Sequence, residues 1–287
     1  MTLLRQRMTE AMQLRGLAFR THESYLGAVQ QLAVHYGKSP DAITEEELRQ
    51  YFLSLCNEKR VAPNTSNVAL NGIKFFYTYT LQRPWPLRDL LRPPIPKKLP
   101  VVLAAEEVWR IVDHSRRPDY RVCLSVISAC GLRLLEGVRL QVTQIDSARM
   151  QVLIRSGKGN KDRAIPLPPR TLTLLRAHWR LHRNPVWLFP GTPRDGERHA
   201  CVPMDESGLQ KAFRHAVQAA GVHKPATIHS LRHAWATHLL ESGVSVRVLQ
   251  LWMGHASPTT TAIYTHLTQH AEQTAAAALE RLTAGLP

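Results

Sequence analysis

Cysteine and long apolar runs are scarce in this sequence. Only 4 of the 287 residues are cysteine, and Cys123 and Cys130 lie inside apolar runs, which favours buried free thiols over disulfides or a zinc site. No run of about eighteen apolar residues occurs, so no membrane span is expected. The amino-terminal stretch MTLLRQRMTEAMQLRG is basic and amphipathic, without a signal-peptide core. We therefore expect a cytoplasmic protein with no membrane partner.

Acidic side chains are also in the minority. The chain holds 22 Asp and Glu against 37 Lys and Arg, which gives a formal net charge of +15. Such an excess repels itself in a compact state and attracts polyanions. It favours a nucleic-acid partner, with general solubility as the alternative explanation. Hydrophobic residues make up 44% of the chain, which is enough for the cores of one or two folded domains.

Proline is concentrated in one stretch. Six of the seventeen residues from Pro84 to Pro100 are proline. Because proline blocks helix continuation and favours extended backbone, this stretch predicts a semi-rigid connection between two folding units. The predicted organisation is a first domain over 1–83, a linker over 84–100 and a second domain over 101–287.

The first part of the chain shows only helical patterns. Thr21 can cap a helix that runs to Tyr36, and Thr44 and Glu47 form a capping-box pattern at the start of another helix. A further helix is predicted over 64–81. With the amino-terminal helix this makes about four helices and no strand, which predicts a compact all-α unit.

The second part combines helices with one hairpin. Residues 150–155 and 163–167 alternate between apolar and polar on either side of a glycine-containing turn, which predicts a β-hairpin. Helices are predicted over 105–115, 120–130, 170–183 and 205–220, and in the segment that follows Thr227. The expected fold class is mainly α with a small β-sheet (α+β).

Residues 227–266 combine three kinds of phosphate chemistry. His229 and Arg232 are three apart, which places both on one face of a helix, and His255 and Tyr264 follow. An arginine can hold phosphate oxygens, imidazoles can move protons, and a phenol can attack phosphorus. No acidic cluster stands among them to bind magnesium, and His229 and His233 have no third metal ligand beside them. We expect neither metal nor cofactor.

Three motifs resemble those of the tyrosine recombinases, the phage-integrase family, and in particular their compact Xer-like members. The segments HSLRH at 229–233, MGH at 253–255 and YTH at 264–266 resemble the family pattern H-x-L-R-H, L-G-H and Y, with Met253 in place of the usual leucine. The segment GLRLLE at 131–136 is similar to G-L-R-x-x-E. The segment GKGNKDR at 157–163 is similar to the hairpin G-K-G-x-K-x-R.

The resemblance implies an amino-terminal helical core-binding (SAM-like) domain and a carboxy-terminal catalytic domain. It also implies DNA cutting and rejoining through a covalent 3′-phosphotyrosyl intermediate, with Glu136 supporting Arg133. The residues that match the family's catalytic positions are Arg133, Lys158, His229, Arg232, His255 and Tyr264.

The implied partner is double-stranded DNA with paired recombination sites, bound by a homotetramer or heterotetramer. The carboxy-terminal helix could pack on its own domain or on a neighbouring subunit. Basic or polar side chains of the first domain and the linker could contact DNA phosphates, although a solvated surface explains each equally well. These candidates are Arg20, Lys59, Arg60, Asn64, Lys74, Lys97 and Lys98. Lys161 and Arg163 of the hairpin motif are expected to hold backbone phosphates.

Two other functions remain open at this point. A type IB topoisomerase could use the same residue types to relax DNA, and a catalytically inert accessory protein could bind DNA with the same basic surfaces. The sequence does not specify the target DNA. It also does not separate chromosome-dimer resolution from the movement of a transposon, plasmid or phage, because no recognition helix shows which bases it contacts.

Overall fold

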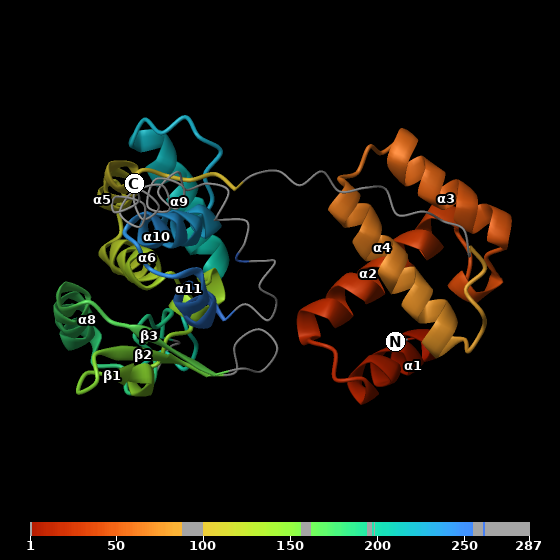
Figure 1. The fold of residues 1–287 in the computed structure, drawn as a ribbon. Helices are drawn as coiled ribbons and strands as arrows, with labels where there is room; N and C mark the ends of the chain where they lie inside the picture. The colour runs from red at the N-terminus through yellow and green to blue at the C-terminus, as the bar shows by residue number, and fades with distance from the viewer. Residues whose placement is uncertain are drawn as a thin grey trace, which may run out of the picture. The chain divides into compact units, whose positions relative to one another are not determined.

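A computed structural model describes residues 2–87, 100–155, 162–193, 197, 199–254 and 261 (Figure 1). The chain divides into two compact units, Met1–Lys98 and Leu99–Pro287. This division lies inside the predicted 84–100 linker, and the finer domain bounds stay a prediction. In the described part of the chain, the helices are too short or too polar to cross a bilayer.

The first unit consists of helices around one apolar core. These are α1 (Leu3–Leu14), α2 (Phe19–Tyr36), α3 (Glu45–Asn57) and α4 (Pro63–Phe75), with a 3-10 turn at Pro40–Ala42 and a π-helical turn at Phe76–Thr80. Residues 2–87 contain no strand. The core includes Met12, Leu32, Leu48 and Ile73, each with no exposed surface.

Two helix boundaries in this unit were predicted imperfectly. Helix α2 begins at Phe19, and its amino-terminal cap position is Ala18, which makes no side-chain hydrogen bond, so Thr21 is not the cap. The predicted 64–81 helix becomes π-helical after Phe75. The capping box at α3 is confirmed, because Thr44 Oγ1 accepts from the Glu47 N–H at 3.3 Å and the Glu47 carboxylate accepts from the Thr44 N–H at 2.8 Å.

The second unit packs its helices around a separate core. They are α5 (Ala105–Asp113), α6 (Pro118–Cys130), α7 (Leu134–Val138), α8 (Pro169–His182), α9 (Glu206–Ala219), α10 (Ile228–Glu241) and α11 (Val246–Met253). Helix α10 packs against α6 and α11, and α11 lies beside the sheet (Figure 1). Cys123 and Cys130 of α6 are fully buried free thiols, as predicted. Burial raises the pKa of Cys130 to about 12, so its thiol stays protonated.

A three-stranded antiparallel sheet completes the second unit. Its strands are β1 (Ile145–Asp146), β2 (Gln151–Ile154) and β3 (Arg163–Pro166), in the order β1-β2-β3. The predicted hairpin corresponds to β2 and β3, with Val152 opposite Ile165 and Ile154 opposite Arg163. Strand β1 was not predicted, because two residues are too few to show an alternating pattern. The expected fold class is confirmed.

Candidate active site

Arg133 and Glu136 form the first part of a charged cluster at the start of α7. Arg133 is the amino-terminal cap position of the helix and Glu136 lies three residues later, where a carboxylate can reach back to the cap. The Glu136 carboxylate accepts from the Arg133 backbone N–H at 2.8 Å and from Arg133 Nη1 at 2.8 Å. The predicted support of Arg133 by Glu136 is therefore present as a two-point contact.

Arg163 reaches the same carboxylate from β3. Its Nη1 lies 3.0 Å from Glu136 Oε1 and its Nη2 lies 2.6 Å from Oε2, a side-by-side pairing of guanidinium and carboxylate. The Arg163 side chain is only 6% exposed. The sequence predicts a DNA-phosphate contact for Arg163. In this structure its donors point at protein acceptors instead.

Arg232 brings a third guanidinium from α10. Its side chain is 1% exposed, and its Nη1 lies 4.0 Å from Glu136 Oε2. Nη1 donates to the Gly131 carbonyl oxygen at 2.6 Å, and Nη2 donates to the Met253 carbonyl oxygen at 2.6 Å. Gly131 ends α6 with a φ of 58°, a left-handed conformation that glycine adopts readily. The glycine thereby turns its carbonyl group to Arg232.

The carboxyl end of α11 accepts hydrogen bonds from all three arginines. The Trp252 carbonyl oxygen accepts from Arg163 Nε at 2.7 Å, and the Met253 carbonyl oxygen accepts from Arg133 Nη2 at 3.2 Å in addition to Arg232. The last carbonyl groups of a helix have no partner within the helix and carry partial negative charge. Helix α11 therefore stabilises the guanidiniums in a second way, independent of Glu136.

The cluster has an excess of positive charge. Three guanidiniums surround one carboxylate, so the described part of the site carries a net charge of about +2 and suits an anion such as a phosphodiester. Burial acts to raise the pKa of Glu136, but the hydrogen bonds and charges of Arg163 and Arg133 outweigh it and hold the pKa at about 2. Glu136 is thus ionised at neutral pH.

His229 lies in the first turn of α10, near the arginines. Its ring meets the ring of His233 edge-on, with 4.5 Å between the centroids. Desolvation by the surrounding protein lowers the pKa of His229, and the charges of Arg232 and Arg133 lower it further. Burial, His229 and Arg232 lower the pKa of His233 to about 4. Both imidazoles are therefore neutral at pH 7, and a neutral imidazole can accept a proton.

The structure brings together three of the predicted catalytic residues, Arg133, His229 and Arg232, with the supporting residue Glu136. Three predicted catalytic residues, Lys158, His255 and Tyr264, lie outside the described residues, so the convergence of the whole set stays a prediction. The DNA-contact candidates Lys97, Lys98 and Lys161 also lie outside them.

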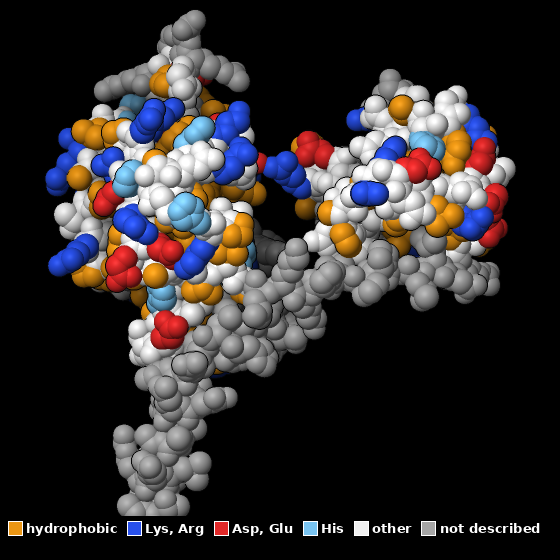
Figure 2. Space-filling model, turned by 90° about the horizontal axis from the view of Figure 1, so that it is seen from above, with side chains coloured by type: hydrophobic (Ala, Val, Ile, Leu, Met, Phe, Trp, Pro, Cys, Tyr) orange, Lys and Arg blue, Asp and Glu red, His pale blue; other side chains and the backbone are white. Residues whose placement is uncertain are grey.

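The remaining candidates for DNA contact are on the first unit. A phosphate contact requires an exposed side chain, and all five candidates are exposed, but exposure alone does not test the contact. They are Arg20, Lys59, Arg60, Asn64 and Lys74. Figure 2 shows Lys and Arg side chains scattered over the visible face of each unit, with Asp and Glu among them. The positive charge on that face is spread out and does not mark one binding patch.

The position of Arg163 in the cluster is the feature that sequence reasoning missed. Ile154 and Arg163 are opposite each other in the register, so their side chains share a face of the sheet. The same face carries Ile165, which has no exposed surface. Alternation along 163–167 could have shown that Arg163 points to the protein interior, because residues two apart in a strand lie on one side.

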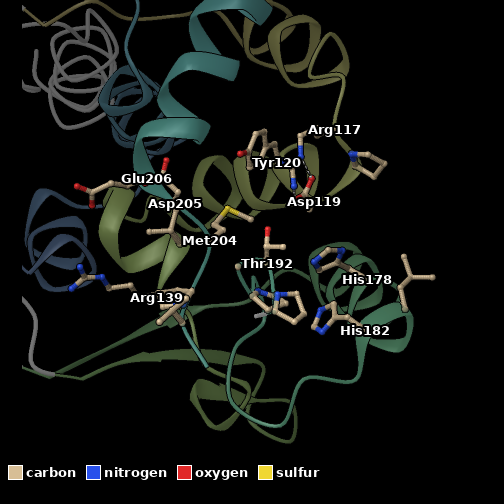
Figure 3. Close-up of a pocket in the computed structure, with 18 residues that line it drawn as sticks. Arg117, Asp119, Tyr120, Arg139, His178, His182, Thr192, Met204, Asp205 and Glu206 are labelled. Atoms are coloured by element: carbon tan, nitrogen blue, oxygen red, sulfur yellow. Dashed lines mark hydrogen bonds and ion pairs between the residues drawn. The ribbon is translucent and has the colours of Figure 1, made fainter. Parts of the chain in front are cut away.

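A separate cavity of about 990 Å³ lies between α6, α8 and the loop before α9 (Figure 3). None of the clustered arginines lines it. Its charges are mixed, and its Asp119 is already paired with Arg117 at 2.6 Å. Across the described ranges, no group of three or more His, Cys, Asp or Glu side chains is arranged for a metal ion. The described motif residues Arg133, His229 and Arg232 do not line this cavity.

Comparison with known proteins gives two family matches. Residues 101–271 match the phage integrase family, and residues 4–87 match the phage integrase N-terminal SAM-like domain. The chain is 43% identical to a Sinorhizobium fredii protein provisionally named integrase/recombinase y4qK, over 92% of this chain and 84% of that one. It is 33% identical to tyrosine recombinase XerD of Pseudomonas putida, over 71% of this chain and 72% of that one.

A solved structure shares the fold. The site-specific recombinase XerH, bound to its difH substrate in a pre-cleavage complex, aligns with a TM-score of 0.68 at 20% identity, over 95% of this chain and 84% of that one. At this level of identity the likeness concerns the arrangement of helices and sheet. It extends across both units of the chain.

Proposed function

This chain belongs to the phage integrase family and is a tyrosine recombinase, and we propose that Tyr264 attacks a DNA phosphodiester held by the arginine cluster. The enzyme acts on duplex DNA at specific sites, cutting and rejoining strands through a covalent 3′-phosphotyrosyl link. The observation that supports the assignment of residues is the cluster itself, in which Glu136 holds Arg133 and Arg163 while Arg232 lies 4.0 Å away.

Charge stabilisation is the part of the reaction that the described residues perform. Arg133 and Arg232 bind the two non-bridging oxygens, where negative charge grows as the phosphorus becomes five-coordinate. A preorganised donor of this kind lowers the activation barrier by about 3 kcal/mol. Because both guanidiniums are fixed by protein acceptors before DNA arrives, little reorganisation is needed at the moment of reaction.

Three proton donors or acceptors complete the proposed reaction. The Tyr264 oxygen forms a bond to phosphorus as the bond from phosphorus to the 5′-oxygen breaks. His229 accepts the tyrosyl proton and Lys158 gives a proton to the departing 5′-oxygen. His255 donates a hydrogen bond to a phosphate oxygen. The 5′-hydroxyl of a second strand then reverses the step, and the bond energy is kept in the phosphotyrosyl link, so no ATP is needed.

The two-part organisation suits a clamp on DNA. We propose that residues 1–83 form the core-binding domain, 84–100 the linker and 101–287 the catalytic domain, and that four subunits assemble on two paired sites. The helix predicted after Tyr264 would dock on its own or a neighbouring subunit. We place the enzyme in the cytoplasm, where it acts in integration and excision of a mobile element or in resolution of joined DNA.

Covalent trapping tests the proposal. Duplexes are first selected from a random pool by their binding to the protein, and a nick is then placed near the cleavage position so that the released fragment diffuses away. The intact chain should accumulate a covalent protein–DNA product, and Tyr264→Phe should form none while still binding the duplex. Tyr79→Phe, on an exposed tyrosine of the first unit, is the matched control and should cleave normally.

Two further assays separate the alternatives. A topoisomerase would relax supercoiled plasmid without joining two sites, whereas a recombinase should join two copies of the selected site. An inert accessory protein would bind DNA and form no covalent product. Trapped DNA that persists in Tyr264→Phe would show that another residue is the nucleophile.

A further inference from the structure

We propose that Arg163 is a positioning residue of the strand-cleavage step, which aligns Arg133 by holding the Glu136 carboxylate that the two arginines share. This inference rests on the proposed function. It assigns Arg163 to the protein side of the site, and it replaces the DNA-phosphate contact that its basic side chain and its place in the GKGNKDR motif suggest.

Each of the three guanidinium nitrogens of Arg163 donates to a protein acceptor. Nη1 and Nη2 pair with the two oxygens of Glu136 at 3.0 and 2.6 Å, and Nε donates to the Trp252 carbonyl oxygen at 2.7 Å. A DNA phosphate could reach this guanidinium only by breaking the pairing. Taking one partner from a buried ion pair is strongly unfavourable, because it leaves the other charge without compensation.

Arg163, Glu136 and Arg133 differ in their burial. Arg163 is 6% exposed, Glu136 is 11% exposed and Arg133 is 23% exposed. Arg133 is therefore more accessible to a phosphate than Arg163, and Glu136 contacts both. Arg232 is more buried still, at 1% exposed, but its Nη atoms donate to backbone carbonyl oxygens and its Nη1 lies 4.0 Å from the carboxylate. Arg163 therefore holds the Glu136 carboxylate from its more buried side. Arg133 lies on the more exposed side, and the same carboxylate orients its guanidinium.

Gly254 provides independent support for a built contact. A Cβ atom added to Gly254 would lie 2.9 Å from Arg163 Cδ, and Gly254 has a φ of +61°. The side chain of Arg163 thus passes directly across the backbone that ends α11. Through Glu136 and Trp252 it connects β3 to α7 and to α11, which are 27 and 89 residues away in the chain.

The chemistry explains why an arginine is needed at this position. Only a planar fork can meet both carboxylate oxygens and still offer Nε to a carbonyl group on another edge. A lysine would keep the charge, but its three N–H donors share one nitrogen, so it cannot reproduce contacts that three separate guanidinium nitrogens make. The proposal therefore predicts that charge alone does not restore function.

The test compares Arg163→Lys and Arg163→Gln with the unaltered protein and with Arg149→Gln. Arg149 is the matched control because it lies before β2 in the same sheet region and is 80% exposed. Three quantities are measured: the covalent cleavage rate at saturating nicked DNA, the dependence of DNA affinity on salt, and the midpoint of thermal unfolding. We expect both Arg163 variants to cleave at least tenfold more slowly, with unchanged affinity and salt slope.

A phosphate contact would give the opposite pattern. The slope of log affinity against log salt would fall by about one and binding would weaken, while the cleavage rate at saturation would stay normal. That result would overturn the proposal. If Arg163→Gln does not fold, Arg163→Lys decides, because it keeps the buried positive charge; a normal cleavage rate in folded Arg163→Lys would also overturn it.

A double-mutant comparison separates positioning from a general loss of structure. If Arg163 acts through Glu136, the effect of Arg163→Lys on the cleavage rate should largely disappear in a Glu136→Gln background. Additive effects would overturn the proposal. If the unaltered protein forms no covalent product at all, the proposed function fails together with this inference. If it does and the Arg163 variants match it, only this inference fails.

Discussion

Arg232 and Met253 are joined by a hydrogen bond of 2.6 Å between the Nη2 atom and the carbonyl oxygen, which links α10 to the end of α11. The same guanidinium donates Nη1 to the Gly131 carbonyl oxygen at 2.6 Å, where α6 ends. Three helices thus meet at one side chain that is 1% exposed. A residue predicted to bind phosphate therefore also holds the helices of its own site in place.

Replacing Arg232 by Lys should damage both stability and catalysis. Lysine keeps the charge but cannot donate to Gly131 and Met253 in the same geometry, and an unsatisfied buried acceptor costs about 1–3 kcal/mol. We expect a loss of that size in the free energy of unfolding, measured with urea, and a cleavage rate at least a hundredfold lower. Arg176→Lys, on the exposed side of α8, is the control and should change neither quantity.

Glu136 should contribute stability that disappears in acid. Its pKa of about 2 in the folded protein is below its ordinary value of 4.5, so its contribution is complete above pH 4.5 and is lost as the pH falls toward 2. A shift of this size corresponds to roughly 3 kcal/mol. Glu136→Gln should therefore be less stable than the unaltered protein by about that amount at pH 7, and the difference should shrink between pH 4.5 and 2.

Urea unfolding at several pH values measures this difference. Glu241→Gln, at the exposed end of α10, is the control for loss of an acidic side chain in the same unit. The prediction is contradicted if the difference in the free energy of unfolding between Glu136→Gln and the unaltered protein stays constant down to pH 2. The carboxylate charge would then not be the origin of the stability.

Gly131 should tolerate no side chain. Its φ is +58°, and a Cβ atom there would lie 2.3 Å from Cε3 of Trp235. The left-handed conformation costs roughly 1–2 kcal/mol for a residue with a Cβ, and overpacking costs roughly 1–3 kcal/mol more. Gly221→Ala isolates the first effect, since Gly221 has a φ of +64° and nothing within 4 Å of the added atom.

The comparison of the two glycines is made on the free energy of unfolding. Gly131→Ala should lose more stability than Gly221→Ala. It should also cleave DNA more slowly than the unaltered protein, because the Gly131 carbonyl oxygen accepts a hydrogen bond from Arg232. Equal losses in the two variants would mean that the Trp235 ring moves aside without cost.

Local patterns in the sequence predicted most helix starts and stops. The capping box at Thr44 is present, and α2 and α6 end at the predicted residues Tyr36 and Cys130. The contact between Arg133 and Glu136 was implied by the family motif, and their spacing of three residues allows it. These features depend on neighbours in the chain, so one sequence is enough to show them.

The contacts that the sequence did not reveal join distant segments. Nothing near Arg163 indicates that its partners are Glu136 and Trp252, because that depends on how β3 packs beside α7 and α11. The acceptor role of the α11 carbonyl groups could not be predicted either, because every residue has a backbone carbonyl group whatever its side chain. The π-helical turn at Phe76–Thr80 had no recognisable signal either.

His229 and His233 of α10 should stay neutral at pH values where an ordinary histidine is protonated. Desolvation lowers the pKa of His229, with Arg232 and Arg133 adding to the effect, and burial, His229 and Arg232 lower that of His233 to about 4. Because the folded pKa lies below the unfolded value of 6.5, protonation favours unfolding. Stability from these residues is complete above pH 6.5 and is lost as the pH falls through their lowered pKa values, about 4 for His233.

A pH titration of the DNA-free protein by NMR, followed at the imidazole carbon-bound protons, measures both pKa values. His233 should remain neutral to about pH 5, and the midpoint of His229 should fall below 6.5. His229→Asn removes one of the charges that lower the pKa of His233, so the His233 midpoint should rise in that variant, while Arg149→Gln should leave it unchanged. If the pKa of His233 is unshifted in the intact protein, or is lower in His229→Asn, the neighbouring cationic groups do not set the pKa of these imidazoles. The neutral state matters for cleavage, since a protonated His229 could not take the proton of the attacking phenol.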